Sequence, residues 1–283
     1  MIPYVEIPVY QIGPIPLDPW GTLVCIGFVV GLEVARARGI KLGLNVPDVV
    51  DGIVAIVLSG FVVGHLVHVL AYHPDQLQTE SNFDISGFTF SLPHGVKALI
   101  SIWAGFSSMG GFLGAVLGAV VFYRFIRKRS FLAHADAIMF AFPFAWIFGR
   151  LGCFSVHDHI GKPTTFFLAV NFPGGPRFDL GLLEALWSMV IATVFLLAAR
   201  TTRRPGFFLA LWCVIYAPAR FCFDFLRNTD LKNADVRWYG LTPAQYGCII
   251  MAVAGAALIV HLRRPDAATR EADTAPTPTG GET

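Results

Sequence analysis

Charged residues are scarce in this sequence of 283 amino acids. They make up 14% of the chain, whereas about a quarter is usual for a soluble globular domain, and 55% of the residues are hydrophobic. This composition excludes an ordinary water-soluble domain and indicates an integral membrane protein. The net charge of only +2 gives no sign of nucleic-acid binding, so no nucleic-acid partner is expected.

Cysteine is also sparse, with five residues and no short spacing between any two of them. An odd number without short spacing predicts neither a disulfide framework nor a zinc site, so no metal and no cofactor are expected. Four of the five are interpreted as small packing residues inside apolar runs. The first 19 residues are proline-rich and do not have the pattern of a signal peptide.

Seven apolar runs approach or reach the length of about 20 residues that crosses a bilayer. They lie at about 20–35, 49–72, 96–122, 132–148, 180–199, 206–225 and 242–262. The first and fourth runs are short, and a partly re-entrant path is a second interpretation of them. Non-helical backbone at membrane depth is tolerated only where protein or water surrounds it. The sequence therefore predicts an all-α integral membrane protein with seven transmembrane helices in one membrane domain, 20–262.

Basic residues cluster after the first, third, fifth and seventh runs. These are Arg36, Arg38, Lys41, Arg124, Arg127, Lys128, Arg129, Arg200, Arg203, Arg204, Arg263 and Arg264. The positive-inside rule makes that side cytoplasmic. The N-terminal segment 1–19 is then expected outside, where the connections 73–95, 153–179 and 227–241 form a small head. The C-terminus is expected to be cytoplasmic, with a disordered tail at 263–283.

A polar segment at 149–164 directly follows the fourth apolar run. Arg150 stands at the end of that run, and a charge at membrane depth costs about 2.5 kcal/mol or more. Such a residue is a candidate functional residue by default. His157, Asp158 and His159 follow, and histidine has an unperturbed pKa of about 6.5 that suits proton transfer. An exposed polar loop at the membrane surface is an equally good interpretation of the histidines.

The sixth run carries a polar stripe. Tyr216, Arg220 and Asp224 recur every four residues and Arg227 follows three residues later, so all four are expected to share one face of a helix. One interpretation is an Arg220–Asp224 salt bridge that only fixes packing. The other is that two arginines and one acid leave a positive surplus, which suits a phosphate through bidentate hydrogen bonds.

The third run presents a face of small residues, because Gly110, Gly114 and Gly118 recur every four residues. This spacing is typical of close helix packing. A second interpretation is that Gly110 and Gly111 let the backbone approach a lipid headgroup. The two interpretations are compatible.

Five segments in the same order resemble the prolipoprotein diacylglyceryl transferases, seven-span enzymes of the bacterial inner membrane, from about residue 20 to 261. Residues 149–154 are similar to the family signature Gly-Arg-(Ile/Leu)-Gly-Asn-Phe, and 161–164 to its Gly-Arg-Pro-Thr ending. Residues 102–114 resemble its Trp-x-Gly-Gly and His-Gly-Gly segment. Residues 216–227 resemble its Tyr-Gly-x-x-Arg-x-x-x-Glu-x-x-Arg helix, and 241–245 its Leu-(Ser/Thr)-x-Gly-Gln motif.

The resemblance implies a transferase of lipoprotein biosynthesis. It implies transfer of the diacylglyceryl group of phosphatidylglycerol, a membrane lipid, to the lipobox cysteine thiol of a prolipoprotein signal peptide. The product is a thioether, and glycerol phosphate leaves. Arg150 and Arg220 are then expected to hold the phosphate, and His157, Asp158 and His159 are the candidate bases. The expected substrate-binding residues are Tyr216, Gly110, Gly111, Gly152, Gly161, Asp224 and Arg227.

The sequence departs from the family pattern at five positions, one of them near Val156, where the family has a second asparagine. Met109 stands where the family has histidine, and Cys153 where it has asparagine. Asp158 and Asp224 replace glutamates, which keeps the charge on a shorter side chain. The loss of two polar groups favours an alternative, a non-catalytic lipid-binding or assembly protein on the same scaffold. A transporter ranks third, because the sequence lacks an inverted repeat and paired broken helices.

Overall fold

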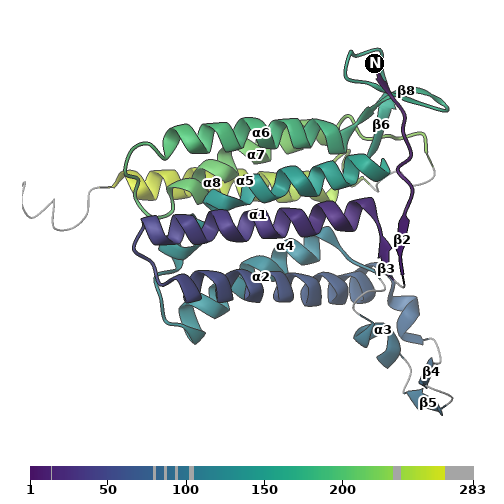
Figure 1. Cartoon of the computed structure of the whole chain (residues 1–283), viewed down its shortest axis with the longest axis horizontal. Coiled ribbons are helices and arrows are strands. Elements are labelled where there is room, and N and C mark those ends of the chain that lie inside the picture. Colours follow the sequence, from purple (N-terminus) through teal and green to yellow (C-terminus); the bar gives the residue numbers. More distant parts are fainter. Residues whose placement is uncertain are drawn as a thin grey trace, which may run out of the picture.

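The computed structural model describes residues 1–13, 15–78, 81–85, 88–92, 95–101, 105–231 and 237–264, without the side chains of 15 and 81–92. The predicted disordered tail lies outside the described residues except for its first two positions. The chain forms a bundle whose long helices run along one common direction, with short strands gathered at one end (Figure 1).

Within the residues that the structure describes, seven long helices build this bundle. They are α1 (Pro19–Lys41), α2 (Val46–Val67), α4 (Ser108–Val120), α5 (Phe131–Val156), α6 (Leu180–Ala198), α7 (Phe207–Asp224) and α8 (Pro243–Arg263). Two π-helical segments, η1 (His68–Tyr72) and η3 (Val121–Ile126), continue α2 and α4. Short helices α3 (Val96–Ile100) and η2 (Pro74–Gln78) lie near the strand-bearing end.

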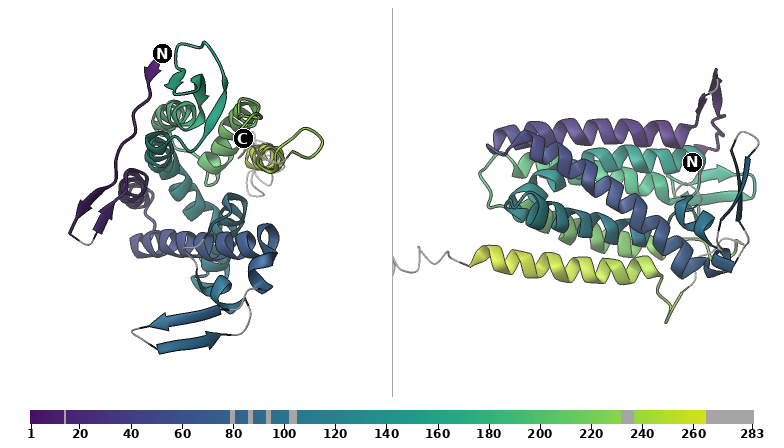
Figure 2. Two further views of the ribbon diagram at one scale, coloured as in Figure 1. Left: turned by 90° about the vertical axis from the view of Figure 1, so that its right-hand side faces the viewer. Right: turned by 90° about the horizontal axis from the view of Figure 1, so that it is seen from below.

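Six of these helices, counted within the described residues, are long and apolar enough to cross a membrane: α2 with η1, α4 with η3, α5, α6, α7 and α8. α1 is not among the six, and it carries Glu33, Arg36 and Arg38 in its second half. It packs along α5 over the same length of the bundle (Figures 1 and 2).

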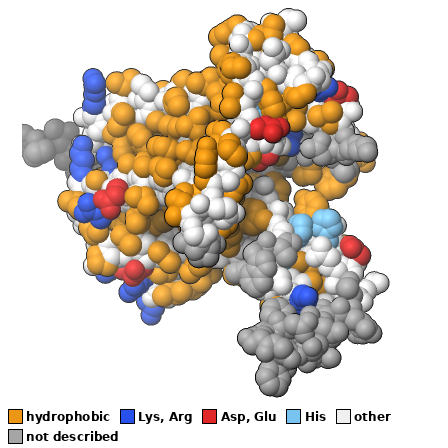
Figure 3. Space-filling view, turned by 45° about the vertical axis from the view of Figure 1, so that its right-hand side comes forward, with side chains coloured by type: hydrophobic (Ala, Val, Ile, Leu, Met, Phe, Trp, Pro, Cys, Tyr) orange, Lys and Arg blue, Asp and Glu red, His pale blue; other side chains and the backbone are white. Residues whose placement is uncertain are grey.

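The outer surface of the bundle is apolar. Large side chains such as Phe28, Leu58, Leu113 and Ile250 are exposed, and hydrophobic atoms cover most of the body (Figure 3). Soluble monomers rarely expose apolar patches larger than a few hundred Å². Together with the six apolar helices, this surface identifies a multi-pass, mainly α-helical membrane protein. Arginine and lysine gather at the end of the body opposite the strands.

The predicted third span is broken in the structure, so that prediction was wrong. α3 ends at Ile100 and α4 begins only at Ser108. Gly105 lies between them with φ +136, a conformation that disfavours side chains, and Ser107 caps α4 by accepting a hydrogen bond from the Gly110 N–H at 3.3 Å. The serine and glycines therefore start a new helix inside an apolar run.

The predicted fourth span is longer in the structure than its apolar run. α5 continues as one 26-residue helix to Val156, so the expected loop at 153–179 begins instead at His157, whose φ of +50 ends the helix. α1 is likewise one continuous helix of 23 residues, so neither helix is re-entrant. Arg150 and Cys153 consequently lie on a rigid helix.

α7 matches its apolar run but ends at Asp224. Tyr216, Arg220 and Asp224 therefore share a helix as predicted, whereas Arg227 follows the helix and does not belong to the stripe. Pro218 lies inside α7.

Short strands cover the far end of the bundle, which an all-α expectation did not include. A four-stranded sheet has the order β1 (Ile2–Pro3), β7 (Val170–Phe172), β8 (Gly175–Asp179) and β6 (Ile160–Pro163). β1 is parallel to β7, and the other pairs are antiparallel. Two hairpins, β2 (Tyr10–Ile12) with β3 (Ile15–Leu17) and β4 (Ser81–Ile85) with β5 (Phe88–Leu92), project from the same end (Figure 2).

A carboxylate from a neighbouring helix completes the N-terminus of α7. Gly206 precedes α7 with φ +96 and offers no side chain for a cap. Asp136 of α5 fills this role by accepting hydrogen bonds from the Phe208 N–H at 2.6 Å and the Leu209 N–H at 3.3 Å.

The Arg38 guanidinium lies over the rings of Phe140 and Phe208, at 4.7 and 5.0 Å. An aromatic core between α5, α6 and α7 begins at this point.

The contact between α2 and α4 depends on glycine. A Cβ atom on Gly114 would lie 2.5 Å from the Ser59 carbonyl oxygen and 2.7 Å from the Val63 Cβ atom. The two backbones therefore approach each other more closely than any larger residue permits. Gly110 belongs to the same contact, since its Cβ would lie 2.6 Å from that of Val67.

We expect Gly114→Ala to lower the free energy of unfolding by about 1–3 kcal/mol, because the added methyl group forces α2 and α4 apart. Thermal unfolding of the detergent-purified protein measures this. Gly149→Ala on α5 is the matched control, since its Cβ would meet only the Trp146 ring, at 3.9 Å. Equal unfolding temperatures for the two variants would contradict the packing argument.

Candidate functional site

Two arginines from different helices meet on one buried carboxylate. Arg150 Nε of α5 lies 3.1 Å from Glu184 Oε2 of α6, and Arg220 Nε of α7 lies 3.3 Å from Glu184 Oε1. The Glu184 side chain is 1% exposed, and those of Arg150 and Arg220 are 12% and 11% exposed. The Arg150 Nε–H is not aligned with the carboxylate for a hydrogen bond, so the attraction there is mainly ionic.

Aromatic residues of α5 and α7 hold this ion cluster in place. The Tyr216 hydroxyl donates a hydrogen bond to Glu184 Oε2 at 2.8 Å, and Trp146 Nε1 donates one to the Tyr216 hydroxyl at 3.2 Å. The Arg150 guanidinium lies over the Trp146 ring at 4.5 Å. Trp212 stacks on Tyr216 with the ring centres 4.4 Å apart. The Arg150 guanidinium and the Glu184 carboxylate are thus held in place by contacts with the packed side chains of Trp146 and Tyr216.

Asp224 connects the cluster to α8. Its carboxylate pairs with Arg220 one turn earlier and accepts a hydrogen bond from the Thr242 hydroxyl. Thr242 is also the N-cap of α8, in a capping box with Gln245. The start of α8 and the end of α7 are therefore joined through a single buried acid.

The four charges balance, which differs from the positive surplus expected from the sequence. Arg150 and Arg220 face Glu184 and Asp224, two charges of each sign. Sequence reasoning missed Glu184 because it weighed only the polar segment and the stripe of the sixth run. The signal was present, since Glu184 is the single charged residue between Leu180 and Ala199. An acid alone in an apolar span requires a partner.

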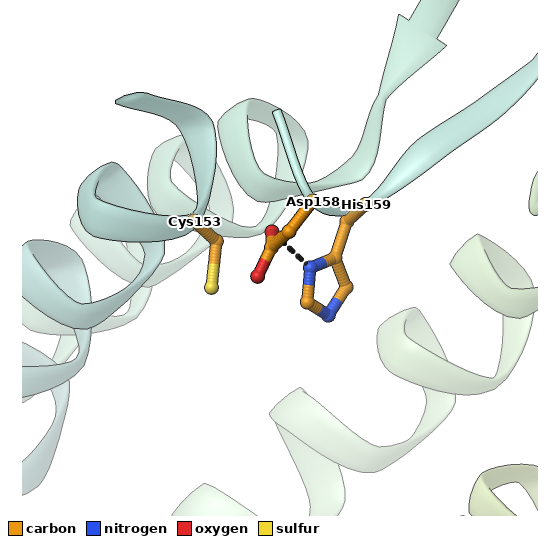
Figure 4. Close-up of side chains that lie close together, drawn as sticks. All are labelled: Cys153, Asp158 and His159. Atoms are coloured by element: carbon orange, nitrogen blue, oxygen red, sulfur yellow. Dashed lines mark hydrogen bonds and ion pairs between the residues drawn. The ribbon is translucent and has the colours of Figure 1, made fainter. Parts of the chain in front are cut away.

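A second polar group lies beside Arg150, at the turn that follows α5. Arg150 Nη1 is 3.4 Å from His159 Nε2 and 3.9 Å from the Cys153 sulfur. His159 Nδ1 is hydrogen-bonded to the Asp158 carboxylate. Ligand atoms of Cys153, Asp158 and His159 all lie within 4.8 Å of one another (Figure 4). Within the described ranges, these three form the one group suited to holding a metal ion.

The electrostatics of His159 follow from these neighbours. Burial lowers the pKa of the imidazole, but hydrogen bonds to Asp158 and Cys153 outweigh burial and raise the pKa to about 9. His159 is therefore protonated at neutral pH when nothing else is bound.

His157 is placed differently from its neighbours. Its Nδ1 lies 2.7 Å from Asp179 Oδ2, and its ring packs against Tyr4, Phe154 and Phe172. Asp179 is also the N-cap of α6. The hydrogen bond of His157 thus joins the end of α5 to the start of α6, which is a structural arrangement. Of the two predicted histidines, the structure brings His159 next to Arg150.

The predicted glycines lie in backbone contacts. Gly110 and Gly111 pack in the α2–α4 region, and a Cβ atom on Gly152 would lie 3.2 Å from the Trp20 carbonyl of α1. Gly161 forms a β-bridge with Arg227, and its Cβ would lie 2.7 Å from the Leu226 carbonyl. These contacts explain the glycines through packing. Met109 has its terminal methyl 3.2 Å from the Cβ position of Gly247 on α8.

We expect Glu184→Gln to lower the free energy of unfolding by about 3–5 kcal/mol, because Arg150 then loses the acid it pairs with and Arg220 keeps only Asp224. Thermal unfolding in detergent measures this. Glu33→Gln is the control, since its pair with Arg36 is half-exposed and its loss should not shift the transition. An unchanged transition in Glu184→Gln would show that the cluster does not depend on this charge.

Comparison with known proteins shows the family of this chain. The family model described as prolipoprotein diacylglyceryl transferase matches residues 8–261. The phosphatidylglycerol–prolipoprotein diacylglyceryl transferase of Nitratidesulfovibrio vulgaris is 31% identical over 261 residues, covering 89% of this chain and 92% of the relative. The protein of that name from Gluconobacter oxydans is 30% identical over 272 residues, covering 90% and 92%. This chain therefore belongs to the prolipoprotein diacylglyceryl transferase family.

Proposed function

We propose that this protein transfers the diacylglyceryl group of phosphatidylglycerol to the lipobox cysteine thiol of a prolipoprotein, forming a thioether and releasing glycerol phosphate. The names of the relatives state the two substrates of those proteins. The observation that carries the proposal for this chain is the convergence of Arg150 and Arg220 on one buried carboxylate. Such a pair binds an anion of similar shape when that anion replaces the carboxylate.

The leaving group explains why two arginines are needed. Cleavage of the C–O bond leaves negative charge on a phosphate, and preorganised donors in a water-poor site stabilise that charge. A guanidinium offers five N–H donors in a planar fork that matches phosphate oxygens. Arg150 and Arg220 are the proposed phosphate clamp, and Tyr216 is the proposed third donor because its hydroxyl already contacts the carboxylate between them.

The nucleophile is the second requirement. A free cysteine thiol has a pKa of about 8.5, and the thiolate is the species that attacks. The proposed thiol site is the group formed by Cys153, Asp158 and His159, because it lies next to Arg150 at the surface end of α5. His157 is assigned a structural role, since it pairs with Asp179.

The proposed membrane arrangement has seven spans in the bacterial inner membrane, with α1 as the seventh. The N-terminus and the sheet then face the periplasm, and the basic ends of α1, η3, α6 and α8 face the cytoplasm. Positive charges on cytoplasmic ends support this orientation. The arginine pair lies nearer the periplasmic end, because Arg150 precedes the end of α5 by six residues and Arg220 that of α7 by four.

Arg150→Lys and Arg220→Lys should each lower the rate of transfer by about 100-fold or more, because lysine keeps the charge but loses the bidentate geometry. The assay uses purified protein, phosphatidylglycerol vesicles and a lipobox peptide, with thioether formation followed by mass spectrometry. Arg203→Lys, at the opposite end of the bundle, is the matched control and should retain full activity.

The same assay separates the transferase from the alternative. Wild-type protein that binds phosphatidylglycerol vesicles but forms no thioether, and does not support growth of cells depleted of their own transferase, would be a non-catalytic lipid-binding protein. Met109 and Cys153, which replace polar residues of the family pattern, motivate this second candidate.

Alkaline phosphatase inserted after Gly174, in the turn between β7 and β8, should be active, because this turn is proposed to face the periplasm. The same insertion after Gly43, between α1 and α2, should be inactive. No atom lies within 4 Å of the Cβ position of either glycine, so an insertion there displaces no packed side chain. The helices α2, α4 and α5 lie between the two positions, so activity at both would contradict three membrane crossings by these helices.

A further inference from the structure

The turn after α5 brings three metal-ligating side chains together. α5 ends at Val156, and His157 adopts a left-handed conformation that reverses the chain. The Asp158 N–H then bonds back to the Cys153 carbonyl at 3.4 Å, so that residues 158 and 159 lie beside the last turns of the helix. Figure 4 shows the Cys153 sulfur, the Asp158 carboxylate and the His159 ring facing one another.

The ligand set is specific for a class of ion. A thiolate, an imidazole and a carboxylate are the three ligand types that proteins offer to Zn²⁺, whereas Mg²⁺ and Ca²⁺ prefer oxygen ligands only. Catalytic zinc sites have three protein ligands and leave a fourth position for water or substrate. The three ligand atoms lie within 4.8 Å of one another.

We propose that Cys153, Asp158 and His159 bind Zn²⁺ and that the open fourth position binds the thiolate of the prolipoprotein cysteine. This inference rests on the proposed function and deepens it, because it names what ionises the substrate thiol. A thiol coordinated to a metal ion is deprotonated outright. The ion thus supplies the thiolate that the reaction requires, without a separate general base.

Charge balance supports the placement beside an arginine. The Cys153 thiolate and the Asp158 carboxylate carry two negative charges, which neutralise the two positive charges of Zn²⁺. The ion therefore adds no net charge next to Arg150, whose Nη1 lies 3.9 Å from the Cys153 sulfur and 3.4 Å from His159 Nε2. The same closeness places the proposed nucleophile beside the arginine that is proposed to hold the phosphate.

The step balances without any oxidant or reductant. The substrate thiol loses its proton to water when sulfur binds the ion. The sulfur lone pair attacks the carbon of the diacylglyceryl group that is bonded to the phosphate oxygen. A C–S bond forms as this C–O bond breaks. The bonding electrons remain on the phosphate oxygen, and glycerol phosphate leaves with the charge that Arg150 and Arg220 stabilise. The thioether is a weaker ligand than the thiolate and dissociates from the ion.

The binding test uses Co²⁺ as a coloured replacement for zinc. Full-length protein in detergent is freed of metal with a chelator and titrated with Co²⁺, and a near-ultraviolet thiolate-to-cobalt absorption band is expected at one ion per chain. Cys153→Ser should abolish the band, and Asp158→Asn and His159→Ala should weaken Co²⁺ binding. Cys25→Ser, which removes an exposed cysteine of α1, is the matched control and should keep the band. A wild-type protein without the band overturns the proposal.

The activity test separates failure of the zinc site from failure of the proposed function. Chelator-treated protein should lose thioether formation, and Zn²⁺ should restore it in wild-type protein but not in Cys153→Ser. Full transfer by metal-free protein would overturn thiol activation by zinc and leave the transferase intact. A cobalt band in a protein that forms no thioether with or without zinc would support the metal site and overturn the proposed function.

Discussion

The carboxylate of Glu184 determines the architecture of the site. It is almost fully buried and lies within ion-pair distance of arginines from two other helices, while the Tyr216 hydroxyl donates to the same group. Burying a guanidinium in a membrane protein is costly unless it has an opposite charge beside it. Glu184 therefore makes it possible for Arg150 and Arg220 to lie side by side, and it draws α5, α6 and α7 to a common point.

This arrangement has a chemical consequence for the proposed reaction. The Glu184 carboxylate lies between the two guanidinium groups, and in the proposed reaction the phosphodiester of the lipid would take its place there. The arginines then have a negative partner before, during and after turnover. Asp224 keeps a second acid on Arg220 throughout, and its hydrogen bond from Thr242 fixes it to α8. The two guanidinium groups of the proposed clamp are therefore never left without a negative partner in an apolar surrounding.

The parts of this structure that were predictable are those in which one strong constraint acts. Apolar runs predicted α6, α7 and α8 closely. Arg150 and Arg220 were chosen from the sequence as candidate functional residues because charge is rare in such runs. The break between α3 and α4 was missed because local conformation at Gly105 and Ser107 overrides hydropathy. The sheet was missed because strands of two to five residues have no periodic pattern.

The site itself was predictable only in part. Glu184 is visible in the sequence, but its role depends on which helices are neighbours, and spacing along the chain does not encode that. The grouping of Cys153 with Asp158 and His159 depends on the left-handed turn at His157, a conformation uncommon for residues other than glycine. The different surroundings of His157 and His159 likewise depend on a distant residue, because His157 pairs with Asp179, 22 residues further along the chain.

Completion of the α7 N-terminus by Asp136 has a consequence for biogenesis. The first N–H groups of α7 bond to a side chain of α5, and Gly206 supplies none of its own. The ribosome delivers α5 before α7, so the acceptor is already in the membrane when α7 emerges. α7 thus gains its full helical stability only by docking on a helix inserted earlier, and the order of synthesis is also the order in which this part of the bundle assembles.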